Sequence, residues 1–160
     1  MSTNKCTHWQ QQLADSREAL LALLHGLTEE QWQTPVFSEG KPWTVRTVVS
    51  HLIDGERGMS IQVHKIRKGE ETIPPDFDLN RWNASVQKRV GDLSPTELIA
   101  ALETTRARTL DGMATLQENE WTLKGRHPSR GMITVDQYYE TIHGHELSHT
   151  ADMQKALGSK

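Results

Sequence analysis

The stretch TVDQYYETIHGHELSHTADMQKALG, residues 134–158, indicates the fold class, because apolar side chains recur along it in steps of three or four. Such steps place side chains on one face of an α-helix. The pattern predicts a helix from near Thr134 to Leu157, with Gly158 as its stop. The predicted inner stripe consists of Val135, Tyr138, Ile142, His145, His149, Met153 and Ala156.

Three earlier segments show the same helical period. The first covers residues 7–25, and one more helical turn, LTEEQW, follows it with Thr28 as its cap. The second begins at Thr44, another capping residue, and continues to residue 68. The third begins in SPTE, residues 94–97, where a serine cap, a proline and a glutamate stand in the order typical of a helix start.

The connecting segments show no convincing strand alternation, so we interpret them as loops. Residues 33–43 and 69–80 are long connections, and we expect them to act as lids over a pocket. GRHPSRG, residues 125–131, is interpreted as a Gly/Pro loop, and DFDLNRWNASVQKR, residues 76–89, as a short helix. The predicted fold class is all-α, a four-helix bundle with long connecting loops.

Composition limits the classes of function. A chain of 160 residues suits a single domain, which we place at residues 5–158. The net charge is −3 and charges of both signs are interspersed, which argues against a nucleic-acid partner. The longest apolar run, Leu20–Leu24, is too short to span a membrane. Cys6 is the one cysteine of the sequence, which together with the polar N-terminus favours a cytoplasmic location.

Two histidines occupy the apolar stripe of the last predicted helix. His145 and His149 are four residues apart, so their rings lie one turn apart and could hold a single ion. Two satisfied, buried imidazoles are the simpler interpretation, but protonating both would place like charges together. A divalent metal would relieve this conflict if a third ligand were present. His51, at the margin of the apolar face of the second helix, is the best placed, so His51, His145 and His149 are the predicted metal ligands.

The motif HELSH, residues 145–149, matches the HExxH pattern of zinc proteases. We interpret the match as accidental, because no histidine or glutamate follows His149 to complete such a site. Glu146 then needs no catalytic role and is expected behind the ligands or on the helix surface. The remaining histidines fit a shared site less well; they are His8, His25, His64, His127 and His143.

The order of several motifs resembles the DinB/YfiT-like metalloproteins, the damage-inducible-B superfamily, over nearly the whole chain. The motifs are WTVRTVVSHLIDGE, FDLNRWNASVQKR and GRHPSRGMITV followed by HGHELSHTADMQKAL. The resemblance implies a four-helix bundle with a nickel or zinc ion held by His51, His145 and His149. It also implies use of a low-molecular-weight thiol such as bacillithiol or mycothiol. The isomerase branch has Glu where His145 stands, so maleylpyruvate isomerisation is not expected.

The expected function is therefore metal-dependent transfer of a thiol to a small electrophilic molecule, with Zn or Ni as the ion. Such an ion should deprotonate a coordinating thiol at neutral pH. Trp43, Trp82 and Tyr138 are candidate walls of the substrate pocket, although buried aromatic residues more often belong to the core. A metal-dependent hydrolase and a non-catalytic, stress-related metal-binding bundle are the alternatives. A homodimer through exposed helix faces is common in similar proteins and is a further expectation.

Overall fold

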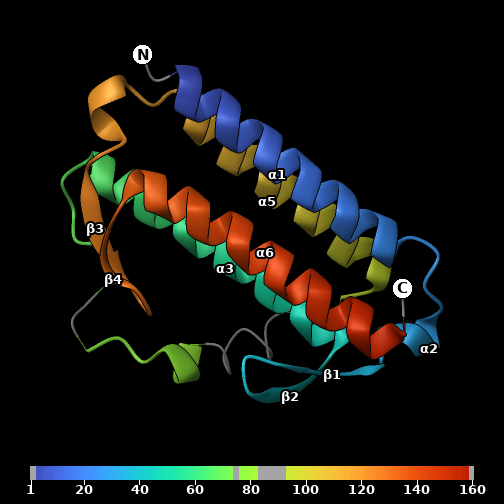
Figure 1. The fold of residues 1–160 in the computed structure, drawn as a ribbon. Helices are drawn as coiled ribbons and strands as arrows, with labels where there is room; N and C mark the ends of the chain where they lie inside the picture. Colours follow the sequence, from blue (N-terminus) through green and yellow to red (C-terminus); the bar gives the residue numbers. More distant parts are fainter. Residues whose placement is uncertain (1–2, 74–75, 83–92, 159–160) are drawn as a thin grey trace.

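Four long helices form the body of the computed structural model, which describes residues 3–73, 76–82 and 93–158 (Figure 1). They are α1 (Thr3–Leu24), α3 (Val45–Arg67), α5 (Pro95–Ala114) and α6 (Val135–Leu157). The predicted helical-bundle class is confirmed. Of the segment at residues 76–89, the structure describes a helical stretch up to Trp82, and residues 83–89 lie outside the described part.

The helix ends lie where the capping residues predicted them. Ser94 and Thr134 accept hydrogen bonds from backbone N–H groups three residues later, which satisfies donors that the first helical turn cannot. Thr28 caps the short helix α2 (Glu29–Trp32) in the same way, and Thr44 caps α3. Gly158 ends α6 in the left-handed conformation, with φ of 73°.

The prediction that the connections contain no strands was wrong, because two of them are β-hairpins. Strand β1 (Pro35–Ser38) pairs with β2 (Lys41–Thr44), and β3 (Lys124–His127) pairs with β4 (Gly131–Thr134), both antiparallel. Each strand has four residues. The first strand of each hairpin buries every second residue, but three of these inward residues are Ser38, Gly125 and His127. Their inward side chains are small or polar, so hydrophobicity does not reveal the alternation.

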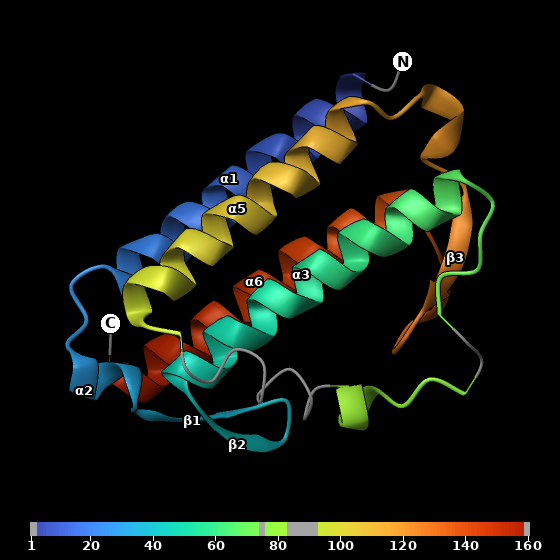
Figure 2. The same cartoon turned by 180° about the vertical axis from the view of Figure 1, so that it is seen from behind.

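The four helices do not alternate in direction along the chain. Figures 1 and 2 show α1 and α6 running one way and α3 and α5 the other. Helix α3 packs against α5 and α6, and α1 packs against α6. Each hairpin lies at one end of the bundle and leads directly into the next long helix, β2 into α3 and β4 into α6. The residue after each hairpin is therefore the first residue of a helix that carries predicted ligands.

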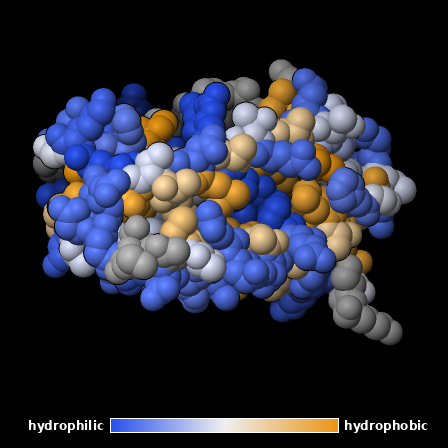
Figure 3. Space-filling model, turned by 90° about the horizontal axis from the view of Figure 1, so that it is seen from above, coloured by the Kyte–Doolittle hydropathy of each residue, from blue (hydrophilic) through white to orange (hydrophobic). Residues whose placement is uncertain are grey.

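The core consists of two apolar clusters. One includes Leu13, Met59 and Met113, and the other includes Leu20, Leu52 and Leu102. Along each of the four long helices a buried charged residue lies between the two clusters. By contrast, the surface seen in Figure 3 is largely hydrophilic, with hydrophobic atoms in interrupted patches. Among the described residues, no helix has the length and apolarity needed to cross a bilayer.

The polar layer between the clusters is a set of four charged side chains, one from each long helix, here called the buried quartet: Arg17, Glu56, Arg106 and Glu146. Arg106 donates to Glu56 at 2.9 Å and to Glu146 at 3.1 Å. Arg17 donates to Glu146 at 2.9 Å and to Glu56 at 3.3 Å. Burial raises the pKa of Glu146, but the charges of Arg106 and Arg17 outweigh it and hold that pKa below its ordinary value.

The buried quartet is arranged with an internal two-fold correspondence. Arg17 and Arg106 are 89 residues apart and Glu56 and Glu146 are 90 apart. Arg17 donates to the carbonyl oxygen of Leu102, and Arg106 to that of Leu13, again 89 residues apart. The element order also repeats, since a long helix, a short helix, a hairpin and a long helix occur twice, with the 3-10 turn η1 (Glu118–Glu120) standing in for α2. The two halves are structurally equivalent around the quartet.

Replacing Arg106 with Met should destabilise the fold strongly, because Glu56 and Glu146 would remain buried with one cation between them. The expected loss is about 3–5 kcal/mol in the free energy of unfolding, measured by urea titration at pH 7. Arg108→Met is the matched control; Arg108 is exposed on the same helix, and the change should stay within about 0.5 kcal/mol. Equal stability of the two variants would show that the quartet does not hold the helices together.

Candidate metal centre

His51, His145 and His149 lie together in the groove between α3 and α6. The Nε2 atom of His145 is 3.0 Å from Nε2 of His51 and 3.0 Å from Nε2 of His149. The rings meet edge to face, with centroids 4.5–5.1 Å apart. His149 and His51 are buried, and the His145 side chain is 21% exposed. All three rings therefore direct the same nitrogen toward one point.

A fourth donor, Glu39, reaches this point from the tip of the first hairpin. Its Oε2 is 2.7 Å from Nε2 of His51 and 3.1 Å from Nε2 of His149, and its Oε1 is 3.7 Å from Nε2 of His145. Glu39 has φ of 51°, in the left-handed region that residues other than glycine rarely adopt, and Gly40 follows at 72°. The two-residue turn thus accepts a local backbone cost that directs this carboxylate at the imidazoles.

The protonation of His149 follows from its partners. Ser38 Oγ donates to Oδ2 of Asp152, because an ionised carboxylate can only accept. Having used its one proton, Ser38 accepts from Nδ1–H of His149 at 2.7 Å. In a neutral His149 ring the lone pair is then on Nε2, the nitrogen that faces His145 and Glu39. Burial lowers the pKa of His145; the hydrogen bond with Glu39 opposes this shift, and the charges of the His149 and His51 imidazoles reinforce it.

This donor set fits a divalent cation. In a neutral His149 with its proton on Nδ1, Nε2 and a Glu39 oxygen would place two lone pairs 3.1 Å apart, a contact that a proton or a divalent cation between them relieves. The 3.0 Å spacings also match neighbouring ligand atoms around one ion, about 2.8–3.4 Å for bonds of about 2.0–2.1 Å. Three imidazoles and one carboxylate suit Zn or Ni as well as other first-row metals.

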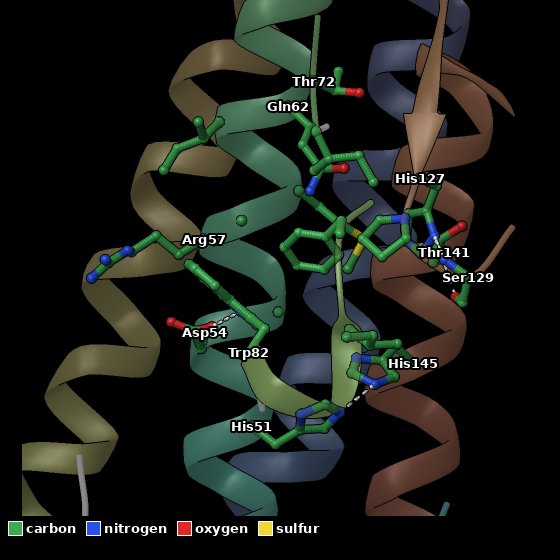
Figure 4. Close-up of a pocket in the computed structure, with 18 of the residues that line it drawn as sticks. His51, Asp54, Arg57, Gln62, Thr72, Trp82, His127, Ser129, Thr141 and His145 are labelled. Carbon is green, nitrogen blue, oxygen red and sulfur yellow. Dashed lines mark hydrogen bonds between the residues drawn. The ribbon is translucent and has the colours of Figure 1, made fainter. Parts of the chain in front are cut away.

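A cavity of about 370 Å³ opens beside these donors, between α3, α6 and the second hairpin (Figure 4). His51 and His145 lie at one end and His127 lies farther along it. Met59, Ile73, Phe77 and Trp82 contribute apolar surface. The indole N–H of Trp82 donates to Asp54 at 2.8 Å, which fixes the ring beside the cavity. The volume lies near the lower limit of about 300–1,000 Å³ for small-molecule sites.

The candidate wall residues have different positions. Trp82 lines the cavity, whereas Trp43 packs against His51, with ring centroids 4.8 Å apart. Tyr138 is fully buried in the core and donates to the backbone oxygen of Arg126. Of the two expected lid segments, residues 33–43 supply Glu39 and residues 69–80 supply Ile73 and Phe77 to the cavity lining.

Sequence reasoning missed two residues of the site, and two other residues lie elsewhere than expected. Glu39 and Ser38 lie in a segment interpreted as a loop, and the EG pair between two short runs was the available turn signal. Glu146 is not on the helix surface, because it is 2% exposed and belongs to the buried quartet. His127, judged a loop residue, lies in β3 and lines the cavity.

The comparisons with known proteins agree with one another. A model described as the DinB superfamily matches residues 12–153. YfiT of Bacillus subtilis, a candidate metal-dependent hydrolase, is 27% identical over 156 residues, covering 94% of this chain and 84% of YfiT. Its solved structure, described as an unusual four-helix bundle, superposes with a TM-score of 0.75 at 25% identity, covering 100% of this chain and 91% of that one.

Two more distant structures share the fold. Mycothiol-dependent maleylpyruvate isomerase superposes with a TM-score of 0.76 at 15% identity, and 96% of this chain matches 60% of that chain. This chain therefore spans less than two thirds of the isomerase. The colibactin self-resistance protein ClbS, solved with double-stranded DNA, gives 0.70 at 17% identity, with 94% of each chain covered. At these identities the likeness concerns the fold alone.

Removing the imidazole of His149 should abolish tight metal binding. We expect His149→Ala to weaken Zn²⁺ or Ni²⁺ affinity by more than about 100-fold. Loss of a residue that only orients a ligand weakens metal binding by about 10- to 100-fold, and loss of the ligand itself should cost more. Isothermal titration of metal-stripped protein measures the change. His143→Ala is the matched control, because His143 is on the same helix but faces Trp9. Equal metal affinity in both variants would show that His149 is not a ligand.

Ser38→Ala should weaken metal binding without removing a ligand. The change leaves Nδ1 of His149 without its acceptor and Asp152 without its donor. An affinity loss of about 10- to 100-fold is expected, at nearly unchanged stoichiometry. Competition against a chromogenic chelator measures the affinity. An unchanged affinity would mean that the Ser38–Asp152 pair does not orient His149.

Proposed function

The chain belongs to the DinB superfamily, and we propose that it is a metal-dependent enzyme that transfers a low-molecular-weight thiol to a small electrophilic molecule. The observation that carries the proposal is the convergence of three Nε2 atoms and the Glu39 carboxylate beside a largely apolar cavity. His51, His145 and His149 would hold the ion. Zn or Ni is the proposed metal, and a bound ion of this kind lowers the pKa of a coordinating thiol or water.

Glu39 differs from the other three donors in a way that favours chemistry over a closed structural site. Its side chain is 46% exposed, whereas that of His149 is 1% exposed. A half-exposed ligand on a hairpin turn can move aside when a thiol arrives, without disturbing a helix. Oε2 makes the close contacts, which leaves Oε1 as the atom available to receive the proton of the incoming nucleophile.

The cavity walls would hold the electrophile. Phe77 and Trp82 pack against each other with ring centroids 5.9 Å apart and present apolar surface to the cavity. Trp82 is fixed by Asp54, so it can exclude water from one side of a bound molecule. We propose a small-molecule partner rather than nucleic acid, since the net charge is −3. The cytoplasmic location, the homodimer and a single domain over residues 5–158 stay predictions.

Metal-dependent hydrolysis is the second candidate. It is favoured by YfiT, described as a candidate metal-dependent hydrolase, and by Glu39, which could equally receive a proton from water. The non-catalytic alternative is supported by the same residue, because Glu39 could close the coordination as a fourth protein ligand. Thiol transfer requires an added thiol, hydrolysis requires only metal and water, and the non-catalytic bundle supports neither reaction.

An activity screen with and without thiol separates them. Metal-loaded protein is given 1-chloro-2,4-dinitrobenzene with bacillithiol, mycothiol or cysteine, so that a C–S bond forms as chloride leaves. We expect catalysed product formation with at least one thiol, a loss of more than about 100-fold in His149→Ala, and near-normal rates in His143→Ala. A parallel assay follows 4-nitrophenyl acetate without thiol.

Each other outcome contradicts thiol transfer in a definite way. Full activity in metal-stripped protein would exclude a metal-dependent mechanism. Ester hydrolysis that needs metal but no thiol, together with no thiol product, would favour the hydrolase. Tight metal binding with neither reaction would favour the non-catalytic bundle.

A further inference from the structure

The second hairpin places one histidine in the cavity that the proposed metal chemistry does not use. His127 ends β3, is 9% exposed, and directs its ring into the cavity, away from the end occupied by His51 (Figure 4). It corresponds to Ser38 in the other half of the chain, since the two residues end the first strands of the two hairpins, 89 positions apart. His127 lines the cavity, as does Glu39, the residue that follows Ser38.

The tautomer of His127 is fixed by the turn that follows it. Nδ1 accepts backbone N–H bonds from Ser129 at 3.1 Å and from Arg130 at 3.2 Å. Backbone N–H groups can only donate, so Nδ1 is unprotonated and the ring proton of the neutral histidine is on Nε2. The hydrogen bonds found for His127 among the described residues are made by Nδ1, and its ring lines the cavity. The Nε2–H donor of the neutral ring is therefore open to the cavity.

The His127 ring is also neutral at ordinary pH, so its single proton remains on Nε2. Burial, followed by the positive charge of Arg130 and the effect of His145, lowers the pKa of His127 to about 4. At neutral pH the ring is therefore a hydrogen-bond donor that carries no charge. Such a group recognises an oxygen acceptor.

We propose that His127 is a substrate-positioning residue whose Nε2–H donates a hydrogen bond to a carbonyl oxygen of the substrate. The inference rests on the proposed function in one respect, namely that this cavity holds the substrate. The substrate class it implies is a small, largely apolar carbonyl compound. Phe77 and Trp82 contact its apolar part, and its reactive end lies toward His51 and His145.

Two variants separate positioning from a purely structural role in the turn. In His127→Asn the amide oxygen can take the place of Nδ1 and accept the turn N–H groups, but the donor in the cavity is lost. In His127→Gln the longer amide can present an N–H near the place of Nε2, but the acceptor for the turn is lost. The Asn variant therefore removes the donor that faces the cavity, and the Gln variant removes the acceptor for the turn.

The binding test uses the metal-loaded protein and a matched pair of probes, acetophenone and α-methylstyrene. They have nearly the same shape, and only acetophenone has a carbonyl oxygen. Ligand-observed NMR titrations give the two dissociation constants, thermal unfolding gives the stability, and the ¹⁵N resonance of His127 Nε2 reports on its hydrogen bond.

We expect wild-type protein to bind acetophenone about five- to tenfold more tightly than α-methylstyrene, with a shift of the Nε2 resonance for acetophenone alone. His127→Asn should lose this preference while its thermal stability stays close to wild type. His127→Gln should keep most of the preference and be less stable. A merely structural role predicts that His127→Asn keeps whatever preference the wild type has.

Equal affinities of the two probes for wild-type protein, or no saturable binding of either, would overturn the proposal. So would a preference that His127→Asn retains. None of these measurements uses a thiol or a turnover rate. A negative thiol-transfer screen would therefore not change the conclusion of the binding test, and a negative binding test would not contradict the proposed metal chemistry.

Discussion

The buried quartet is the constraint on which the other features of this protein depend. Two arginines and two glutamates, one from each long helix, are joined by five charge-assisted hydrogen bonds in the middle of the core. Each arginine also donates to one backbone carbonyl oxygen. Ions buried in this way cost much desolvation energy, and the cost is offset only when each has its partners in good geometry. The helices can therefore rotate or slide very little. An apolar core of the same volume would allow more freedom.

This constraint directs the candidate metal ligands. His51 precedes Glu56 by five residues, about 140° around α3, and His145 precedes Glu146 by one residue, about 100° around α6. Turning both glutamates toward the core centre therefore turns His51 and His145 toward the groove between their helices. His149 follows one turn later on the same side as His145. The β1–β2 hairpin then brings Ser38 and Glu39 to the three histidines, whose positions the helices have fixed.

The long helices and the grouping of the three histidines could be predicted from the sequence, because the helical period of apolar residues repeats over many residues. The long stripe on α6, with two histidines in it, predicted both the helix and the grouping with His51. The hairpins gave no such signal, because strands of four residues with inward Ser38, Gly125 and His127 carry little hydrophobic alternation. Glu39 could not be placed without its turn. The ion pairs of Glu146 could not be predicted because its partners, Arg17 and Arg106, are 129 and 40 residues away in the chain.

The parallel pairing of α1 with α6 has a consequence for synthesis on the ribosome. The first three long helices can emerge and collapse together, but Glu146, His145 and His149 all arrive with α6, more than 100 residues after α1. Until α6 has been synthesised, Glu56 is the single quartet carboxylate available to Arg17 and Arg106. His51 then lacks the two other candidate ligand histidines. Contacts of such long range slow folding, and the incomplete bundle exposes apolar surface. The candidate metal ligands are therefore complete only in the last stage of folding, so the proposed ion would bind after α6 has packed against the other helices.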